Sequence, residues 1–416
     1  MKLKRILSVI LTVSIIAANF SSVVQISAQT DESASNQAAQ IAVAEESSVQ
    51  TAARPAEPTN KFIISSEDDF ESFMTTPVLW GSSHKVILEC DIDMKGKAFK
   101  PIKEFGGVFD GCEHTISNFK IQDNSNKGKN AELSFINTLN ENAEIKNVAF
   151  DNYTIEGKSE IKKVAGLTVT NHGTISGVDI INGSINNIGK KANIAGFVLG
   201  NEEDGVIENC FVSMNNKDSN IKFGFVVKNY GKIAKSSTTI SVNNKDLASG
   251  FVGENFGEIE KCNSKGNVES KKCAGGFCGN NSGEISDCKS EGMVKAKVSN
   301  GITICGGFIA ENSGIIKNCS SKGAVEGQEF TGGFAGINSD NGEISLCKAI
   351  CDVKSHTYIA SINCGGFVGL DAGKIEDCSF DGKVYGCVDS EKVVGIAVGV
   401  TVGVLLTIAG ICLTVK

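Results

Sequence analysis

The chain has 416 residues and a formal net charge of −8, and it contains 46 glycines, 15 cysteines and only 4 prolines. The acidic balance, without a basic run beyond the first residues, argues against a nucleic-acid-binding protein. The abundance of glycine argues against a mainly helical protein, because glycine is unfavourable within helices.

The N-terminus has the features of an export signal. Three of the residues Met1–Arg5 are basic, Ile6–Phe20 is mainly apolar, and small residues follow up to Ala28. This order predicts a secretory signal peptide over residues 1–28, with a retained membrane anchor as the alternative. Residues 29–60 are rich in Ala, Ser, Gln and Glu, and we expect a flexible spacer there.

Residues 61–107 are predicted to cap the N-terminal end of a repeat domain. Ser66 fits the N-cap of a short helix, with Asp69 near its first turn. The apolar segment Val86–Met94 is predicted to be the first strand, and Gly107–Ile116 the first coil.

Residues 108–388 repeat one pattern ten times, best preserved as GGFxGxNxGxIxxCxSxGxV. The most compact spacing between copies is 26 residues, and longer spacings reflect insertions. Some insertions lie between repeats, at Val298–Ile302 and Ser355–Ile362. The leading apolar residues of the ten copies are Phe109, Phe135, Leu167, Phe197, Phe225, Phe251, Phe277, Phe308, Phe334 and Phe367. A period of this length is typical of a solenoid, in which each unit contacts only its neighbours.

Other positions of the repeat also recur. One column is Ile175, Ile207, Ile233, Ile259, Ile285, Ile316, Ile344 and Ile375. Three residues later follows a column of Val178, Cys210, Ser236, Cys262, Cys288, Cys319, Cys347 and Cys378. An Asn-x-Gly turn precedes the Ile column, where we expect Asn and Gly because both tolerate a positive φ.

Three short strands in each 26-residue unit predict one coil of a parallel β-helix. A four-stranded propeller blade would need about 40 residues. We therefore predict an all-β solenoid of about ten coils, spanning roughly 45 Å at about 4.8 Å per coil. A short capping helix precedes it, and a transmembrane helix follows it.

The Gly-Gly-Phe-x-Gly and Asn-x-Gly-x-Ile-x-x-Cys units, clearest from Ser249 to Val384, resemble the GLUG repeats of bacterial surface proteins and adhesins. The resemblance covers about three quarters of the chain. It implies a right-handed parallel β-helix with an adhesive or interaction role. Some proteins of this wider set are immunoglobulin-cleaving metallopeptidases with a zinc domain after the repeats. The four histidines of this chain are His84, His114, His172 and His356, and none lies in an H-E-x-x-H sequence.

Fifteen cysteines in an exported protein would ordinarily indicate a disulfide framework. Six of them share one repeat position with Val178, and Cys305 and Cys364 share another, which indicates packed columns. Side chains in register point in parallel, and this suits the disulfide dihedral angle poorly. We therefore expect buried free thiols, with scattered disulfides as the alternative.

The sequence does not gather catalytic or metal-binding residues. Cys273 with Cys278, and Cys347 with Cys351, are close in sequence, but a column supplies ligands in a line rather than a tetrahedron. The carboxylates are spread over outward positions and turns: Asp91, Asp93, Glu258, Glu284, Glu343, Asp352 and Asp377. We expect no catalytic, cofactor-binding or metal-ligating residues. The alternative is a polysaccharide-cleaving enzyme, which would need carboxylates gathered in one groove.

Residues 393–415 form a 23-residue segment without a charge. The segment is long enough to cross a hydrocarbon core of about 30 Å, and with the export signal it predicts a single-pass anchor with the repeats outside. A cleaved lipid-anchor signal is the alternative. Gly395, Gly399 and Gly403 recur at four-residue intervals, which would let two such helices form a weak homodimer.

Together these features predict a cell-surface, membrane-anchored protein. We expect an extracellular protein or glycan ligand, bound by exposed strands or by the two inter-repeat insertions. A purely structural surface spacer is the second alternative. We expect no cofactor and no nucleic-acid partner.

Overall fold

The computed structural model describes residues 58–123, 131–157, 160–189, 191–215, 221–297, 302–356 and 363–386. The predicted signal peptide, most of the spacer and the apolar segment 393–415 with its three glycines lie outside these residues. Most of both inter-repeat insertions lies outside them as well. Within the described residues, no helix has the length and apolar character needed to cross a membrane.

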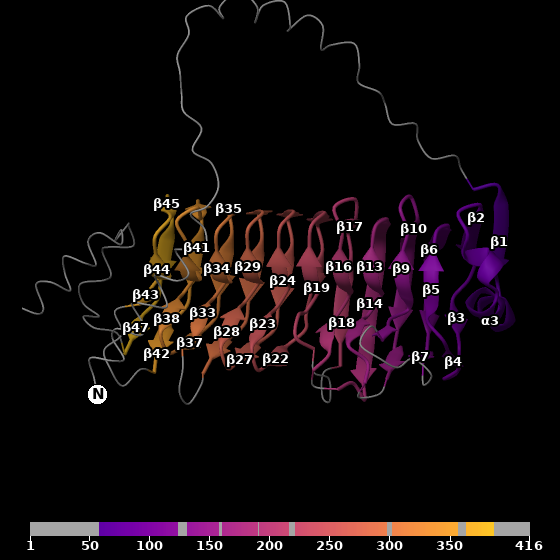
Figure 1. The fold of residues 1–416 in the computed structure, drawn as a ribbon, viewed down its shortest axis with the longest axis horizontal. Helices are drawn as coiled ribbons and strands as arrows, with labels where there is room; N and C mark the ends of the chain where they lie inside the picture. The colour runs from indigo at the N-terminus through magenta and orange to yellow at the C-terminus, as the bar shows by residue number, and fades with distance from the viewer. Residues whose placement is uncertain are drawn as a thin grey trace, which may run out of the picture. The chain divides into compact units, whose positions relative to one another are not determined.

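The described chain folds into an all-β parallel solenoid of about nine turns, with one short α-helix at its N-terminal end. Figure 1 shows the strands of successive coils aligned side by side along the solenoid, with the helix beside the first coils. Equivalent strands in neighbouring coils pair in parallel and in register, as β19 does with β24. The predicted all-β parallel solenoid is therefore confirmed for the repeats.

One sheet contains the strands that follow the leading apolar residues and end near the Asn-x-Gly turns. Its ten strands are β5 (Ile102–Phe105), β9 (Ile136–Leu139), β13 (Thr168–Asn171), β16 (Val198–Asn201), β19 (Val226–Asn229), β24 (Val252–Asn255), β29 (Cys278–Asn281), β34 (Ile309–Asn312), β39 (Ala335–Asn338) and β44 (Val368–Asp371).

A larger sheet of 23 strands carries the Ile column and the segment that follows it. The strands that contain the Ile column, of which the long ones also enter the following segment, are β1 (Asn60–Ile64), β2 (His84–Leu88), β6 (Val108–Ser117), β10 (Glu144–Asp151), β14 (Thr174–Asn186), β17 (Val206–Glu208), β20 (Lys232–Ala234), β25 (Glu258–Glu260), β30 (Glu284–Ser286), β35 (Ile315–Lys317), β40 (Glu343–Ser345) and β45 (Lys374–Glu376). The others are β3 (Ile92–Asp93), β4 (Ala98–Phe99), β7 (Lys120–Gln122), β11 (Thr154–Glu156), β18 (Phe211–Met214), β21 (Ser237–Thr238), β26 (Asn263–Lys265), β31 (Lys289–Glu291), β36 (Ser320–Lys322), β41 (Lys348–Ile350) and β46 (Ser379–Asp381).

Three smaller sheets complete the coils. The six-stranded sheet contains β22 (Val242–Asn244), β27 (Val268–Ser270), β32 (Val294–Ala296), β37 (Val325–Gly327), β42 (Val353–Ser355) and β47 (Val384–Tyr385). The five-stranded sheet contains β23 (Leu247–Ser249), β28 (Cys273–Gly275), β33 (Ile304–Gly306), β38 (Phe330–Gly332) and β43 (Cys364–Gly365). The three-stranded sheet contains β8 (Glu132–Leu133), β12 (Lys163–Ala165) and β15 (Asn193–Ala195).

The N-terminal helix α3 (Glu67–Thr75) covers the first coils. The Ser66 side chain accepts a hydrogen bond from the Asp69 backbone N–H, which confirms the predicted N-cap. The helix buries Phe70, Phe73 and Met74 in the core, and a short 3₁₀ turn, η1 (Pro77–Trp80), follows it. The apolar end of the solenoid is therefore shielded from water at this side.

The leading Phe residues form a continuous stack inside the solenoid. From Phe197 to Phe367 the rings of successive coils lie face to face, with centroids 4.5–4.9 Å apart. Phe109 is not part of this column, which corrects the predicted register. It pairs with Val86 and Ile145 and therefore begins the Ile column. Nine leading residues remain, from Phe135 to Phe367, in agreement with about nine turns.

The Asn residues of the Asn-x-Gly turns form a second ladder, and it is buried. The Asn229 Nδ2 donates to Asn255 Oδ1 at 2.8 Å, and Asn255 Nδ2 donates to Asn281 Oδ1 at 2.8 Å. The same bond continues from Asn171 to Asn338 and ends on the carboxylate of Asp371. Each amide therefore satisfies its neighbour in the next coil, which makes its burial tolerable.

The ladder corrects the predicted reason for Asn at these turns, because none of the ladder residues has a positive φ. Positive φ occurs instead at the residue before the Cys column, as at Lys261 and Asp287. The Gly of the turn also has an ordinary φ. It is required because a Cβ on Gly257 would lie 2.1 Å from the Gly231 carbonyl oxygen of the preceding coil.

This close approach predicts the effect of a single methyl group. We expect Gly257→Ala to lower the free energy of unfolding by about 1–3 kcal/mol, because a backbone oxygen cannot move away easily. Gly200→Ala is the matched control, since its Cβ would meet mainly the flexible Glu202 side chain. Urea unfolding of both variants measures the difference. Equal midpoints for the two variants would contradict the close approach.

Candidate binding surface

The residue between Asn and Gly in each turn points away from the core, because its neighbour Asn points inward. In two successive coils this position carries an aromatic residue, Tyr230 and then Phe256. Their rings stack with centroids 5.0 Å apart and an interplanar angle of 9°. The two residues remain 37% and 45% exposed, respectively. We call them the aromatic pair.

A shallow groove of about 540 Å³, the Phe256 groove, runs along the solenoid beside the aromatic pair. Its floor is formed by the glycines of five successive turns, which leave the backbone uncovered. Beyond Phe256 it passes Ser282 and reaches Ile315, which is 43% exposed. Glu203, Lys232, Glu258 and Glu284 contribute the charged side chains of its lining.

A second groove, the His172 groove, adjoins the first and shares Glu203 and Tyr230 with it. It has a volume of about 700 Å³. Aliphatic side chains from three neighbouring strands of the ten-stranded sheet, Val169, Leu199 and Val227, line it. The two grooves together offer a continuous surface along the axis with the aromatic pair at its middle.

Most of the charged side chains in these grooves that do not form an ion pair with another side chain of the protein are acidic. In the His172 groove, Lys228 lies 2.9 Å from Glu254, and this hydrogen bond raises the pKa of Lys228. The Lys232 ammonium lies 3.7 Å from Glu258. Among the described residues, the carboxylates of Glu203 and Glu284 have no ion-pair partner. The surface is therefore suited to an uncharged or cationic ligand rather than an anionic one.

Sequence reasoning missed the aromatic pair. It assigned the Phe residues mainly to the inner column and gave no role to the residue between Asn and Gly. The outward position of this residue follows from the burial of the neighbouring Asn, which the structure shows and the repeat pattern did not. Of the predicted scattered carboxylates, the structure brings Glu258 and Glu284 together in the Phe256 groove.

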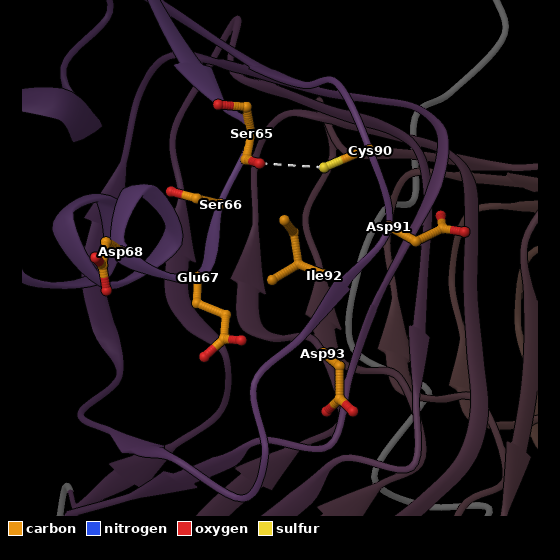
Figure 2. A pocket seen from close by; sticks show the side chains of 8 residues that line it. All are labelled: Ser65, Ser66, Glu67, Asp68, Cys90, Asp91, Ile92 and Asp93. Carbon is orange, nitrogen blue, oxygen red and sulfur yellow. Dashed lines mark hydrogen bonds between the residues drawn. The ribbon is translucent and has the colours of Figure 1, made fainter.

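Asp91 and Asp93 instead line a pocket of about 470 Å³ at the N-terminal cap, together with Glu67 and Asp68 (Figure 2). The four carboxylates do not converge in this view, since Asp68 and Asp91 lie on opposite sides of the pocket. The Cys90 thiol donates to the Ser65 carbonyl oxygen at 3.3 Å and does not face them. Within the described chain, no group of three or more potential ligands could hold a metal ion.

The remaining predicted carboxylates lie apart from both grooves. Asp352 Oδ1 accepts a hydrogen bond from the Lys383 backbone N–H, and Asp377 occupies a positive-φ turn. Glu343 begins β40 and faces outward. The insertion at 298–302 is described only at Ile302, and the one at 355–362 only at Ser355 and His356.

The Cys column is an inner ladder, as predicted. The Cys262 backbone N–H donates to Cys288 Sγ at 3.3 Å, and Cys288 N–H donates to Cys319 Sγ at 3.4 Å. Each thiol in turn donates to the carbonyl oxygen two residues earlier, as Cys288 does to Ser286 at 3.0 Å. The six cysteines of this column are free thiols. Cys364, in the other column, is disulfide-bonded.

The cysteines with close spacing do not meet. Cys273 begins β28 of the five-stranded sheet, whereas Cys278 begins β29 of the ten-stranded sheet and is buried. The Cys351 thiol is directed to the Gly333 carbonyl oxygen at 3.6 Å. Burial raises the pKa of Cys351 to about 12 and that of Cys210 further. Such thiols are poor nucleophiles, which fits a packing role for Cys210 and Cys351.

Comparisons with known proteins add little beyond the fold. No model of a known protein family matches the chain, and no curated protein matches it either. One solved structure is similar, that of a Bacteroides ovatus protein provisionally assigned as an immunoglobulin A1 protease. It is 15% identical, the match covers 76% of this chain and 83% of that one, and the TM-score is 0.31. At this level the likeness is distant and supports no functional conclusion.

The buried thiols predict how stability depends on pH. The folded pKa values of Cys210 and Cys305 lie above the unfolded value, because burial disfavours the thiolate. The two thiols therefore make their full contribution to the free energy of unfolding at neutral pH. This contribution is lost as pH rises above about 8.5, by up to about 1.4 kcal/mol per pH unit for each thiol. Urea unfolding under reducing conditions between about pH 7 and pH 10 measures this loss.

A double variant, Cys210→Val with Cys305→Ala, serves as the comparison, because Val178 and Ala274 occupy the same positions one coil earlier. We expect its stability to fall less steeply with pH than that of the unsubstituted protein. Parallel pH profiles for the two proteins would show that these thiols ionise equally well when folded.

Proposed function

We propose that this protein is a cell-surface binding protein, in which a right-handed β-solenoid of the GLUG type presents the two grooves beside Tyr230 and Phe256 to an extracellular ligand. The observation that carries the proposal is the exposed aromatic pair. The two stacked rings are 37% and 45% exposed and do not belong to the core, which is filled by the separate Phe column. Exposed aromatic side chains beside a groove are typical of a recognition surface.

Export and membrane attachment are supported by the sequence at both ends. The predicted signal peptide at 1–28 would deliver the solenoid outside the cell, and the apolar segment 393–415 would retain it there. Gly395, Gly399 and Gly403 would permit two anchors to pair, which would double the number of grooves presented by one assembly.

A role as a binding protein explains the surface better than the alternatives. A polysaccharide-cleaving enzyme would need an acid and a second carboxylate at a fixed separation, with their pKa values pushed apart. Neither Glu258 nor Glu284 is buried enough for such an environment. A structural spacer would have no need for an aromatic pair that water must solvate.

The proposal predicts that binding depends on the aromatic pair. Cells that display the full chain should bind at least one class of extracellular glycan or matrix protein, and Phe256→Ala should reduce that binding at least tenfold, about 1.4 kcal/mol. Ile350→Ala is the matched control, because Ile350 is similarly exposed on another strand, β41. Binding across arrays of glycans and matrix proteins is the measurement.

Three outcomes are informative. Equal loss in both variants would point to a general effect on the surface rather than to the groove. Binding that is unchanged in Phe256→Ala, but lost when residues 298–302 and 355–362 are deleted, would transfer the binding site to the insertions. The complete absence of binding would favour the structural spacer.

A further inference from the structure

The aromatic column on the outer surface stops after two coils. Tyr230 and Phe256 occupy the position between Asn and Gly, and in the next two coils the same position carries Ser282 and Ser313. Successive coils of a parallel sheet are about 4.8 Å apart, close to the 5.0 Å between the ring centroids of Tyr230 and Phe256. The ring face of Phe256 that is turned toward the coil of Ser282 is therefore not covered by another protein ring.

The space beside that ring face belongs to the Phe256 groove. Ser282 is exposed, and its hydroxyl lies 2.9 Å from the hydroxyl of Ser313. Ile315 closes the groove on the far side as an exposed aliphatic residue. A flat group placed over Ser282 would thus contact an aromatic face on one side and an aliphatic side chain further along the axis.

The edges of the same space are polar. Glu258 and Glu284 project from the outer faces of β25 and β30, next to the turn glycines. Glu258 is partly neutralised by Lys232, whereas Glu284 has no ion-pair partner in the described chain. Carboxylates and hydroxyls at the rim accept hydrogen bonds from a ligand that carries donors around a flat apolar face.

We propose that the Phe256 groove binds a neutral pyranose of an extracellular glycan, with the sugar stacked on Phe256 above Ser282 and its hydroxyls donating to Glu258 and Glu284. The assignment rests on the proposed function and names its ligand class. A pyranose has an apolar C–H face surrounded by hydroxyl donors, and both features have a counterpart here. Glycans with carboxylate or sulfate groups are disfavoured by the unpaired acidic side chains.

An extended peptide is a poorer fit to this surface. Peptides that bind β-proteins commonly add a strand to an open sheet edge. Here β25 pairs with β20 on one side and β30 on the other, so its backbone hydrogen-bonding groups are already used. The surface can recognise only side groups or rings, which favours a glycan.

The groove also indicates the direction of the glycan. It extends from the coil of Gly205 to that of Ile315, four coil steps or roughly 19 Å along the axis. The His172 groove continues it on the other side of Tyr230. An oligosaccharide would therefore lie parallel to the solenoid axis, and affinity should increase with its length.

The test uses the full chain in lipid nanodiscs, because glycoside detergents would compete for the groove. The probes are oligosaccharides of glucose, galactose, mannose and N-acetylglucosamine, with uronic-acid and sialylated oligosaccharides for comparison. Ser282→Phe would continue the protein's own aromatic stack and fill the sugar position. We expect it to weaken binding of the neutral oligosaccharides at least tenfold without loss of the fold.

Asn263→Phe is the control, since Asn263 is an exposed residue on β26 and lies outside both grooves. We expect its affinity to be unchanged, and far-UV circular dichroism verifies the fold of both variants. Binding of neutral oligosaccharides that survives Ser282→Phe would overturn the proposed site. Binding only of anionic glycans or proteins would overturn the ligand class while leaving a binding function intact. Failure to bind any probe or matrix protein would overturn the proposed function itself.

Discussion

The structure depends on one constraint, which is that each inner side chain must fit against its own counterpart one coil away. The asparagine ladder meets it most completely. A primary amide has both a donor and an acceptor, so Asn229, Asn255 and Asn281 can each give one hydrogen bond and receive another. A shift of one residue between coils would leave these amides buried and unpaired, at about 1–3 kcal/mol for each group. The ladder therefore fixes the register of the coils as well as stabilising them.

The other columns satisfy the same constraint by different chemistry. Phe rings stack on Phe rings at 4.5–4.9 Å, and a thiol both accepts from the backbone N–H of the preceding coil and donates to a carbonyl oxygen. The Asn ladder ends at Asp371, which accepts from Asn338 at 2.8 Å and has no amide to offer a further coil. Burial raises the pKa of this carboxyl, although its hydrogen bonds oppose the change. The side chains of these three columns are thus bound to their neighbours in adjacent coils, and the outward positions are free to acquire a function.

The sequence allowed the repeat unit, the Phe and Ile columns and the free thiols of the inner column to be predicted, because identical residues at a fixed period leave few alternatives. It did not reveal why Asn and Gly occupy the turn. Both residues tolerate a positive φ, and only the three-dimensional stacking shows that the amide is buried and that the glycine faces a carbonyl oxygen of the preceding coil. Phe109 was misplaced for a related reason, since a Phe can occupy either the leading column or the Ile column. Phe256 was overlooked because its residue type matches the core, whereas its position in the repeat is external.

The most direct test of this account is a double-mutant cycle within the ladder. Asn229 and Asn255 are hydrogen-bonded, whereas Asn229 and Asn312 lie three coils apart, and all three can be replaced by Ala singly and in pairs. The account predicts a coupling free energy of about 1 kcal/mol or more for the bonded pair, and additivity within about 0.5 kcal/mol for the distant pair. Additive effects at Asn229 and Asn255 would show that the amides do not depend on each other, and the in-register ladder would then be wrong.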